Sequence, residues 1–129
     1  MKIRLKSKPL HPWVIGIVGS RRRNDSQDYL KVLAAFRKVY VPGDEIVSGG
    51  CQAGGDSFAE KIAKIYQVPI KIYYAPWNAR GYTAGFWRNT FIAQDSTVLI
   101  ACVAPDRSGG TEDTIRKFKK MGKKMLVLV

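Results

Sequence analysis

Apolar runs alternate with amphipathic stretches along almost the whole chain. Short apolar runs of this kind are typical of strands in a buried parallel sheet. Between the runs, apolar residues recur every three or four positions, as they do along one face of a helix. The pattern predicts five strands, at residues 13–18, 45–48, 69–74, 96–103 and 124–129.

Helices are predicted between these strands. Asp25 or Ser26 can cap the first helix, and Gly122 ends the last one. Residues 75–85 form a long connection rich in glycine, proline and aromatic residues. The apolar residues at helical spacing are Tyr29, Leu33, Phe36 and Tyr40 in the first helix, Phe58, Ile62 and Ile65 in the second, and Ile115 and Phe118 in the last, with the third helix at 86–94 and the last at 111–121.

This alternation of strands and helices predicts an α/β fold with helices on both faces of a mostly parallel five-stranded sheet. The expected strand order is 3-2-1-4-5, which makes a doubly wound sandwich of three layers. Residues 13–129 form one domain in this interpretation. Residues 1–12 carry several basic side chains and are expected to form an N-terminal arm or an extra edge strand.

Glycine clusters follow three of the predicted strands. Glycine lets backbone N–H groups approach a ligand closely, and the N-terminus of a helix favours anions. With the expected strand order, the three clusters meet at the carboxyl edge of the sheet. The sequence therefore predicts a cleft for a phosphate-bearing ligand. The clusters contribute Gly19, Ser20 and Arg21 after the first strand, Gly49, Gly50, Gly54 and Gly55 after the second, and Gly109, Gly110 and Thr111 after the fourth.

Two common phosphate-binding motifs are excluded by spacing. A dinucleotide-binding fingerprint needs three glycines after the first strand and an acidic residue at the end of the second, and both features are missing. A P-loop needs Lys and then Ser or Thr after its second glycine, but here Asp56 and Ser57 follow Gly55. We read Asp56 either as a helix cap or as an acceptor for ribose hydroxyls.

The sequence gives little support for catalysis by a histidine or for a metal site. The only histidine, His11, precedes the first strand, which places it about 20 Å from the glycine-rich edge. Cys51 and Cys102 lack the spacing of a zinc site or a disulfide framework, and no metal site is expected.

The polar candidates that remain lie at the predicted cleft. Arg21 has a guanidinium fork that suits phosphate. Arg88 and Asn89 either hold a second anionic group or form an exposed helix surface. The aromatic residues of the long connection either stack on a base as a lid, pack locally, or make a homodimer contact. These aromatic residues are Trp77, Tyr82, Phe86 and Trp87.

Charge adds a second possible class of partner. The 129 residues carry a net charge of +12, and six of the cations fall within residues 116–124. Such a surface attracts nucleic acid, although a solvated lysine-rich face has the same composition. No apolar run reaches the roughly 20 residues that a membrane helix needs, and no signal peptide is evident. We therefore expect a cytoplasmic protein with no membrane partner.

Taken in order, four of these segments resemble the SLOG superfamily, which includes DNA-processing protein A and the LONELY GUY cytokinin-activating enzymes. The likeness spans about residues 13–129 and is closest to the small stand-alone YspA-like branch. It implies a Rossmann-like fold that binds or senses a nucleotide or a nucleotide-derived ligand. The segments are Gly19-Ser20-Arg21, Ser48-Gly49-Gly50 through Gly54-Gly55-Asp56, Arg88-Asn89 with Ile92-Ala93, and Gly109-Gly110-Thr111.

The resemblance leaves two alternatives open. DNA-processing protein A binds single-stranded DNA in a basic pocket, which implies a nucleic-acid partner. The LONELY GUY enzymes cleave an N-glycosidic bond with a glutamate three residues after the loop threonine. Here that position is Thr114, so Glu112 and Asp113 are the nearest catalytic candidates for a phosphoribohydrolase activity.

Overall fold

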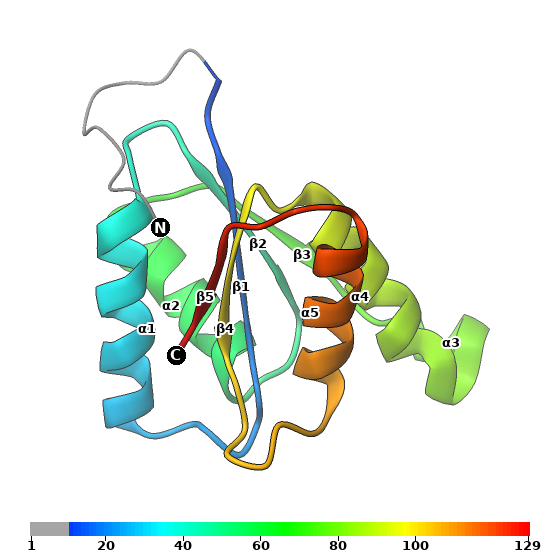
Figure 1. Cartoon of the computed structure of the whole chain (residues 1–129). Helices are drawn as coiled ribbons and strands as arrows, with labels where there is room; N and C mark the ends of the chain where they lie inside the picture. Colours follow the sequence, from blue (N-terminus) through cyan, green and yellow to red (C-terminus); the bar gives the residue numbers. More distant parts are fainter. Residues whose placement is uncertain (1–10) are drawn as a thin grey trace.

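The computed structural model describes residues 11–129, except for the side chain of Tyr82. Within these residues the sheet has five strands, all parallel, in the order β3-β2-β1-β4-β5 (Figure 1). The predicted order is confirmed, and the sheet is wholly rather than mostly parallel. The strands are β1 (Val14–Gly19), β2 (Glu45–Gly49), β3 (Ile70–Tyr73), β4 (Val98–Cys102) and β5 (Leu126–Leu128).

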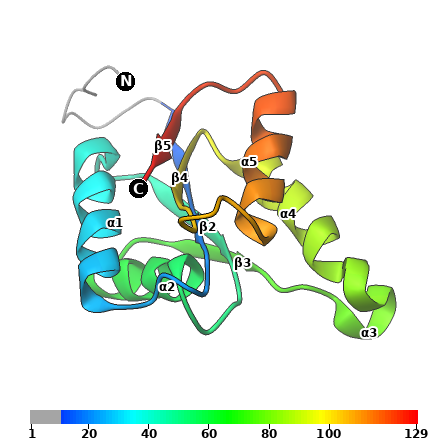
Figure 2. The ribbon, with the colours of Figure 1, turned by 60° about the horizontal axis from the view of Figure 1, so that its bottom comes forward.

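Helices cover both faces of the sheet, as the alternating pattern predicted. The helices α1 and α2 lie on one face, and α4 and α5 lie on the other (Figures 1 and 2). The short α3 projects away from the sheet beyond α4. The helices are α1 (Ser26–Val39), α2 (Gly55–Tyr66), α3 (Trp77–Arg80), α4 (Ala84–Asp95) and α5 (Gly110–Lys120), with a 3-10 turn at Gly81–Thr83.

The first helix shows how local residues set an element's ends. The carboxylate of Asp25 accepts a hydrogen bond from the Asp28 amide at 2.8 Å, so Asp25 is the N-cap and Ser26 is the first helical residue. At the other end Tyr40 has left the helix, and its ring stacks on Phe36 with 4.8 Å between the ring centroids. A side chain therefore caps the start of this helix, whereas at its end the backbone amide of Tyr40 donates to the Phe36 carbonyl at 2.9 Å.

Two apolar clusters, one on each face, hold the layers together. Successive residues of β1 and β4 contribute to opposite faces, because side chains alternate along a strand. Burial on both faces accounts for the nearly continuous apolar runs in the sequence. The cluster under α1 and α2 includes Ile15, Ile17, Phe36, Ile46, Ile62 and Ile100, and the cluster under α4 and α5 includes Val18, Val47, Ile92, Leu99, Ile115 and Phe118.

Two predictions about local structure were wrong. Ile65 does not share the buried face of α2, since its side chain is 59% exposed and the face consists of Phe58, Ala59, Ile62 and Ala63. A spacing of three residues after Ile62 rotates the side chain past the edge of the apolar stripe. Residues 75–85 are also not a simple connection, because they contain α3, the 3-10 turn and the start of α4.

Two other expectations concern the ends and the surroundings of the chain. Most of the predicted arm or edge strand at residues 1–12 lies outside the described residues. Among the described helices, none combines the length and the apolar composition needed to cross a membrane.

Gly55 is required by the close approach of α2 to the end of β1. A Cβ atom at this position would lie 2.3 Å from the Gly19 nitrogen and 2.3 Å from the Val18 carbonyl carbon. Both are backbone atoms, so a larger residue would push α2 away from the sheet.

Gly55→Ala should therefore lower the free energy of unfolding by about 1–3 kcal/mol, as overpacked sites do. Gly85→Ala is the matched control, because its Cβ would meet nothing closer than 3.6 Å. Alanine also favours the helix, so the control should be neutral or more stable. Denaturant titration of both variants measures the difference, and equal stabilities would contradict the packing argument.

Candidate functional site

Three loops meet at the carboxyl edge of the sheet, where β1, β2 and β4 end. Gly19 and Cys102 pair in register, and the Ser20 amide donates to the Cys102 carbonyl at 2.9 Å. Figure 2, in which the bottom of Figure 1 comes forward, shows these loops. A cavity of about 310 Å³, the main cavity, opens between them. It is lined by Val18, Gly19, Ser20, Arg21, Arg22, Cys51, Asp56, Arg88, Asn89, Ile92, Ser108, Gly109, Gly110, Thr111 and Thr114.

The N-terminus of α5 forms one wall of the main cavity. Gly109 precedes the helix with a φ of +106°, a conformation that favours glycine, and Gly110 and Thr111 begin the first turn. First-turn amides have no partner within a helix, and the helix dipole makes this end positive. The wall therefore offers backbone donors to an anion.

Arg88 and Asn89 connect this wall to α4. Arg88 Nε donates to Asn89 Oδ1 at 2.9 Å. Asn89 Nδ2 in turn lies 3.2 Å from the Gly110 carbonyl and 3.2 Å from a carboxylate oxygen of Asp113. Asn89 is almost fully buried. Its amide thus positions the start of α5, while Arg88 presents a positive charge to the cavity.

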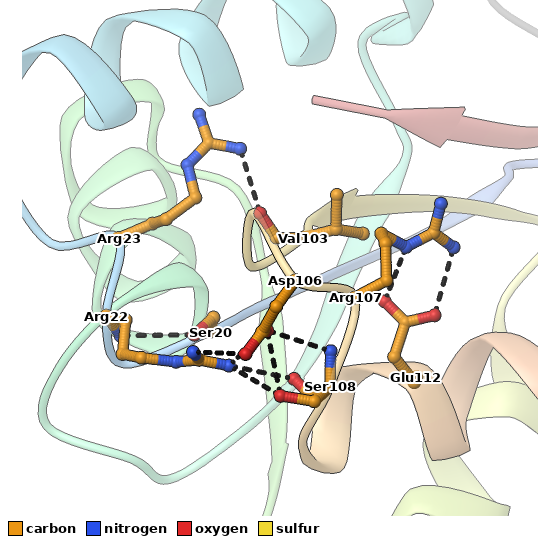
Figure 3. A network of polar contacts seen from close by, with 8 residues as sticks. All are labelled: Ser20, Arg22, Arg23, Val103, Asp106, Arg107, Ser108 and Glu112. Carbon is orange, nitrogen blue, oxygen red and sulfur yellow. Dashed lines mark hydrogen bonds and ion pairs between the residues drawn. The ribbon is translucent and has the colours of Figure 1, made fainter.

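The three consecutive arginines at residues 21–23 lie in three different environments. Arg23 pairs with Asp28 at 2.9 Å, with both side chains largely buried, and donates to the Val103 carbonyl (Figure 3). Arg22 pairs with the exposed carboxylate of Asp106 in the loop after β4. The guanidinium of Arg21 makes no hydrogen bond or ion pair with any described residue. Arg21 is therefore the member of the triplet that remains available to a ligand.

An exposed clasp ties the loop after β1 to the loop after β4. Both terminal nitrogens of Arg22 donate to the carboxylate of Asp106, at 2.8 and 2.9 Å, and one also donates to Ser108 Oγ at 2.8 Å (Figure 3). The bond from Arg22 holds the pKa of Asp106 well below its usual range. Surface pairs add little stability, but a bidentate pair restricts geometry. The clasp thus defines one rim of the main cavity.

Sequence reasoning missed the contribution of this clasp. It selected Arg21 because that residue follows the first strand at the predicted cleft, and it gave Arg22 no role apart from a possible contact with a nucleic-acid backbone. The run of three arginines beside a predicted cleft was the available signal for Arg22. Nothing in the sequence linked Arg22 to Asp106, which lies 84 positions further along the chain.

Asp56 lies at the base of the main cavity and is only 7% exposed. It does not cap α2, whose N-cap is Gly54. Instead its carboxylate accepts from the Cys51 amide at 3.2 Å and lies 3.1 Å from Ser48 Oγ. That hydroxyl also lies 2.5 Å from the Ile17 carbonyl, and its single proton is shared between the two acceptors.

Burial raises the pKa of the Asp56 carboxyl above its ordinary value. The positive charge of Arg88 and the hydrogen bonds at the carboxylate oppose this rise without cancelling it. Gly49 makes room for both groups: a Cβ there would lie 2.6 Å from Asp56 Oδ2 and 2.3 Å from Arg88 Nη1. The cavity floor therefore places an acid of raised pKa beside an arginine.

The other predicted ligand residues have different positions. Gly50 lines a second cavity next to the main one. Gly54 and Gly55 line neither cavity, because they pack against the end of β1. The structure brings into the main cavity Gly19, Ser20, Arg21, Asp56, Arg88, Asn89, Gly109, Gly110 and Thr111.

The two catalytic candidates also lie outside the lining. Glu112 receives two hydrogen bonds from Arg107, at 2.8 and 2.9 Å (Figure 3). Asp113 is buried and pairs with Lys117 at 2.8 Å and with Arg116 at 3.3 Å. Asp56 is thus the acidic residue that faces the main cavity.

The second cavity has a volume of about 340 Å³ and shares part of its wall with the main cavity. Of the aromatic residues predicted to form a lid, Trp77 lines it, and Tyr74 lies there as well. Trp87 lines neither cavity. It packs edge-on against Phe91, and the guanidinium of Arg80 lies 4.2 Å from the centre of its ring. The second cavity is lined by Arg21, Gly50, Cys51, Tyr74, Ala75, Trp77 and Arg88.

Comparison with known proteins supports the fold. The chain is similar to the molybdenum cofactor binding protein from the phototrophic bacterium Rippkaea orientalis, with a TM-score of 0.69 and 20% sequence identity. The similarity covers 93% of this chain and 77% of that one. The sequence matches no family profile and no curated protein. At this identity the likeness shows a shared architecture, and the SLOG resemblance stays a prediction.

The raised pKa of Asp56 gives folding a specific pH dependence. Above the ordinary aspartate pKa the unfolded chain ionises while the folded protein keeps its proton, so this group lowers stability as pH rises towards the folded pKa. The substitution Asp56→Asn removes the titrating group and with it this loss of stability at higher pH. The free energy of unfolding of the variant, relative to wild type, should increase between pH 3 and neutral pH.

Asp25→Asn is the control with the opposite sign. The Asp28 amide lowers the pKa of Asp25, which stabilises the fold above the ordinary aspartate pKa and is lost as pH falls. Denaturant titrations of both variants across this pH range provide the comparison. A flat difference for Asp56→Asn would show that the buried carboxyl keeps an ordinary pKa.

Proposed function

We propose that this protein binds a nucleotide or a nucleotide-derived phosphorylated ligand in the main cavity, as a sensor or a carrier. One observation carries the proposal: Arg21, Arg88 and the N-terminus of α5 come from distant parts of the sequence and line the same cavity. Helix N-termini and arginines are the groups with which proteins hold phosphate.

In this proposal the phosphate lies against the first turn of α5. Backbone amides at Gly109 and Gly110 and the hydroxyl of Thr111 donate to its oxygens, and Arg21 supplies the positive charge. Arg88 holds a second anionic group. Asp56, at the base, hydrogen-bonds a sugar hydroxyl, which a carboxyl group of either charge can do.

The solved neighbour supports a binding role. It is a molybdenum cofactor binding protein, so the same architecture holds a cofactor in that protein. Within residues 11–129, no group of three or more His, Cys, Asp or Glu side chains could hold a metal ion. We therefore assign the main cavity to the phosphate-bearing organic part of a ligand.

Neither alternative from the sequence receives comparable support. The glycosidic hydrolase predicted from the sequence assigns catalysis to Glu112 or Asp113, and both are engaged in ion pairs outside the main cavity. Single-stranded nucleic acid remains consistent with the net charge of +12. It predicts a steep loss of affinity with salt, whereas a mononucleotide in a closed site depends on salt far less.

Arg21→Ala should weaken mononucleotide binding about tenfold or more, because hydrogen bonds to charged groups contribute roughly 1.5–3 kcal/mol. Arg116→Ala is the matched control: it removes the same charge from an exposed helix position outside the main cavity. Calorimetric titration with nucleoside monophosphates measures both variants, with circular dichroism to confirm folding.

The same titrations at two salt concentrations, with a short oligonucleotide added to the panel, separate the two ligand classes. Equal weakening by Arg21→Ala and Arg116→Ala, together with a steep salt dependence, would indicate attraction of polyanions by general charge. Unchanged affinity in Arg21→Ala would remove the proposed phosphate contact.

A further inference from the structure

We propose that the second cavity is a ring-binding subsite for the same ligand. It takes a planar nitrogen heterocycle against Tyr74 and Trp77, while the phosphate of that ligand lies in the main cavity. This inference rests on the proposed function and narrows its ligand to a heterocycle joined to a phosphate.

The two cavities adjoin each other and share three lining residues. Arg21, Cys51 and Arg88 line both of them. The indole of Trp77 and the guanidinium of Arg88 each come within 4 Å of the position that a Cβ on Gly85 would occupy. A molecule with its anionic end in the main cavity therefore passes these arginines before it reaches the aromatic side chains.

Both aromatic side chains are exposed, and the ring of Tyr74 is held against the backbone. Tyr74 is 68% exposed and Trp77 is 56% exposed. A Cβ on Gly50 would lie 2.2 Å from Cδ1 of the Tyr74 ring, so this ring lies directly on the Gly50 backbone. Glycine at this position permits the contact, and the contact restricts the ring. A restricted aromatic side chain loses less conformational entropy when a ligand stacks on it.

Neither ring has a stacking partner within the described part of the chain. The other exposed aromatic residues of this region do: Trp87 contacts Phe91 and Arg80, and Lys117 lies over Phe86. Tyr74 and Trp77 are therefore the members of this group whose faces are open to a guest. Large aromatic faces beside a polar cavity are typical of ligand sites that fix orientation with a few polar groups.

The volumes of the two cavities favour a ligand with two parts. Each cavity is near the lower end of the range of 300–1,000 Å³ in which small-molecule sites fall. Phosphate alone would leave the second cavity empty, and a free base would leave the arginines without an anion. A nucleoside monophosphate or another heterocycle phosphate occupies both.

The test compares ligands with and without the ring. Inorganic phosphate, ribose 5-phosphate, AMP, GMP and CMP are titrated calorimetrically against wild type, Tyr74→Ala and Trp77→Ala. Wild type should bind at least one nucleotide about tenfold more tightly than ribose 5-phosphate, as base stacking on an aromatic side chain predicts. Each alanine variant should lose most of this advantage and keep its affinity for ribose 5-phosphate.

Three further variants separate a ring contact from general damage. Tyr74→Phe and Trp77→Phe keep an aromatic ring and should keep the preference for the nucleotide. Phe86→Ala removes an exposed aromatic side chain of the same region that lines neither cavity, and should behave as wild type. Comparison of AMP and GMP with CMP shows whether the subsite selects purines.

The ring subsite and the proposed phosphate site would fail with different experimental results. If wild type binds ribose 5-phosphate and the nucleotides equally, or if the alanine variants weaken both alike, the ring subsite is wrong and the phosphate site stands. If no phosphate-bearing probe binds wild type, the proposed function fails and the subsite fails with it. If the alanine variants alter sedimentation but not ring preference, the aromatic side chains form a contact between copies.

Discussion

The parallel pairing of β1 with β4 is the constraint on which the candidate site depends. The chain leaves β1 for α1 on one face of the sheet and leaves β4 for α5 on the other. The two connections diverge, and a crevice opens between them at the carboxyl edge, as in other doubly wound sheets. The main cavity lies in that crevice, so the strand order creates the site before any polar side chain is considered.

Charge pairing then decides which arginine of residues 21–23 is left without a partner at the main cavity. Arg23 is committed to a buried carboxylate of α1 and to backbone carbonyls, and Arg22 is committed to the loop after β4. The Arg21 guanidinium has no such partner among the described residues. The pairs on either side of Arg21 thus hold the loops in place, while Arg21 brings an unpaired positive charge to the lining of the main cavity.

The floor of the cavity shows why small residues are needed beside large functional ones. Gly49 leaves space in which the Asp56 carboxylate and the Arg88 guanidinium approach each other. Gly50 similarly leaves space for the ring of Tyr74, and both residues line the second cavity. Each glycine makes room for side chains from other parts of the chain, and those side chains line the two adjoining cavities.

The amino-acid pattern alone determined the strands, because they depend on a periodicity that acts locally. General rules for connections in α/β sheets then led to the expected strand order and to the edge at which the glycine loops meet, and the structure confirms that order. It also identified most of the residues that line the main cavity. Only the tertiary structure showed that the three arginines at 21–23 have different partners. It also placed Glu112 and Asp113 in ion pairs outside the main cavity, and Tyr74 in the wall of a second cavity. Those outcomes depend on distances between side chains that are far apart in the sequence. A charged residue can pair with a partner tens of positions away, and the sequence does not show which partner lies within reach.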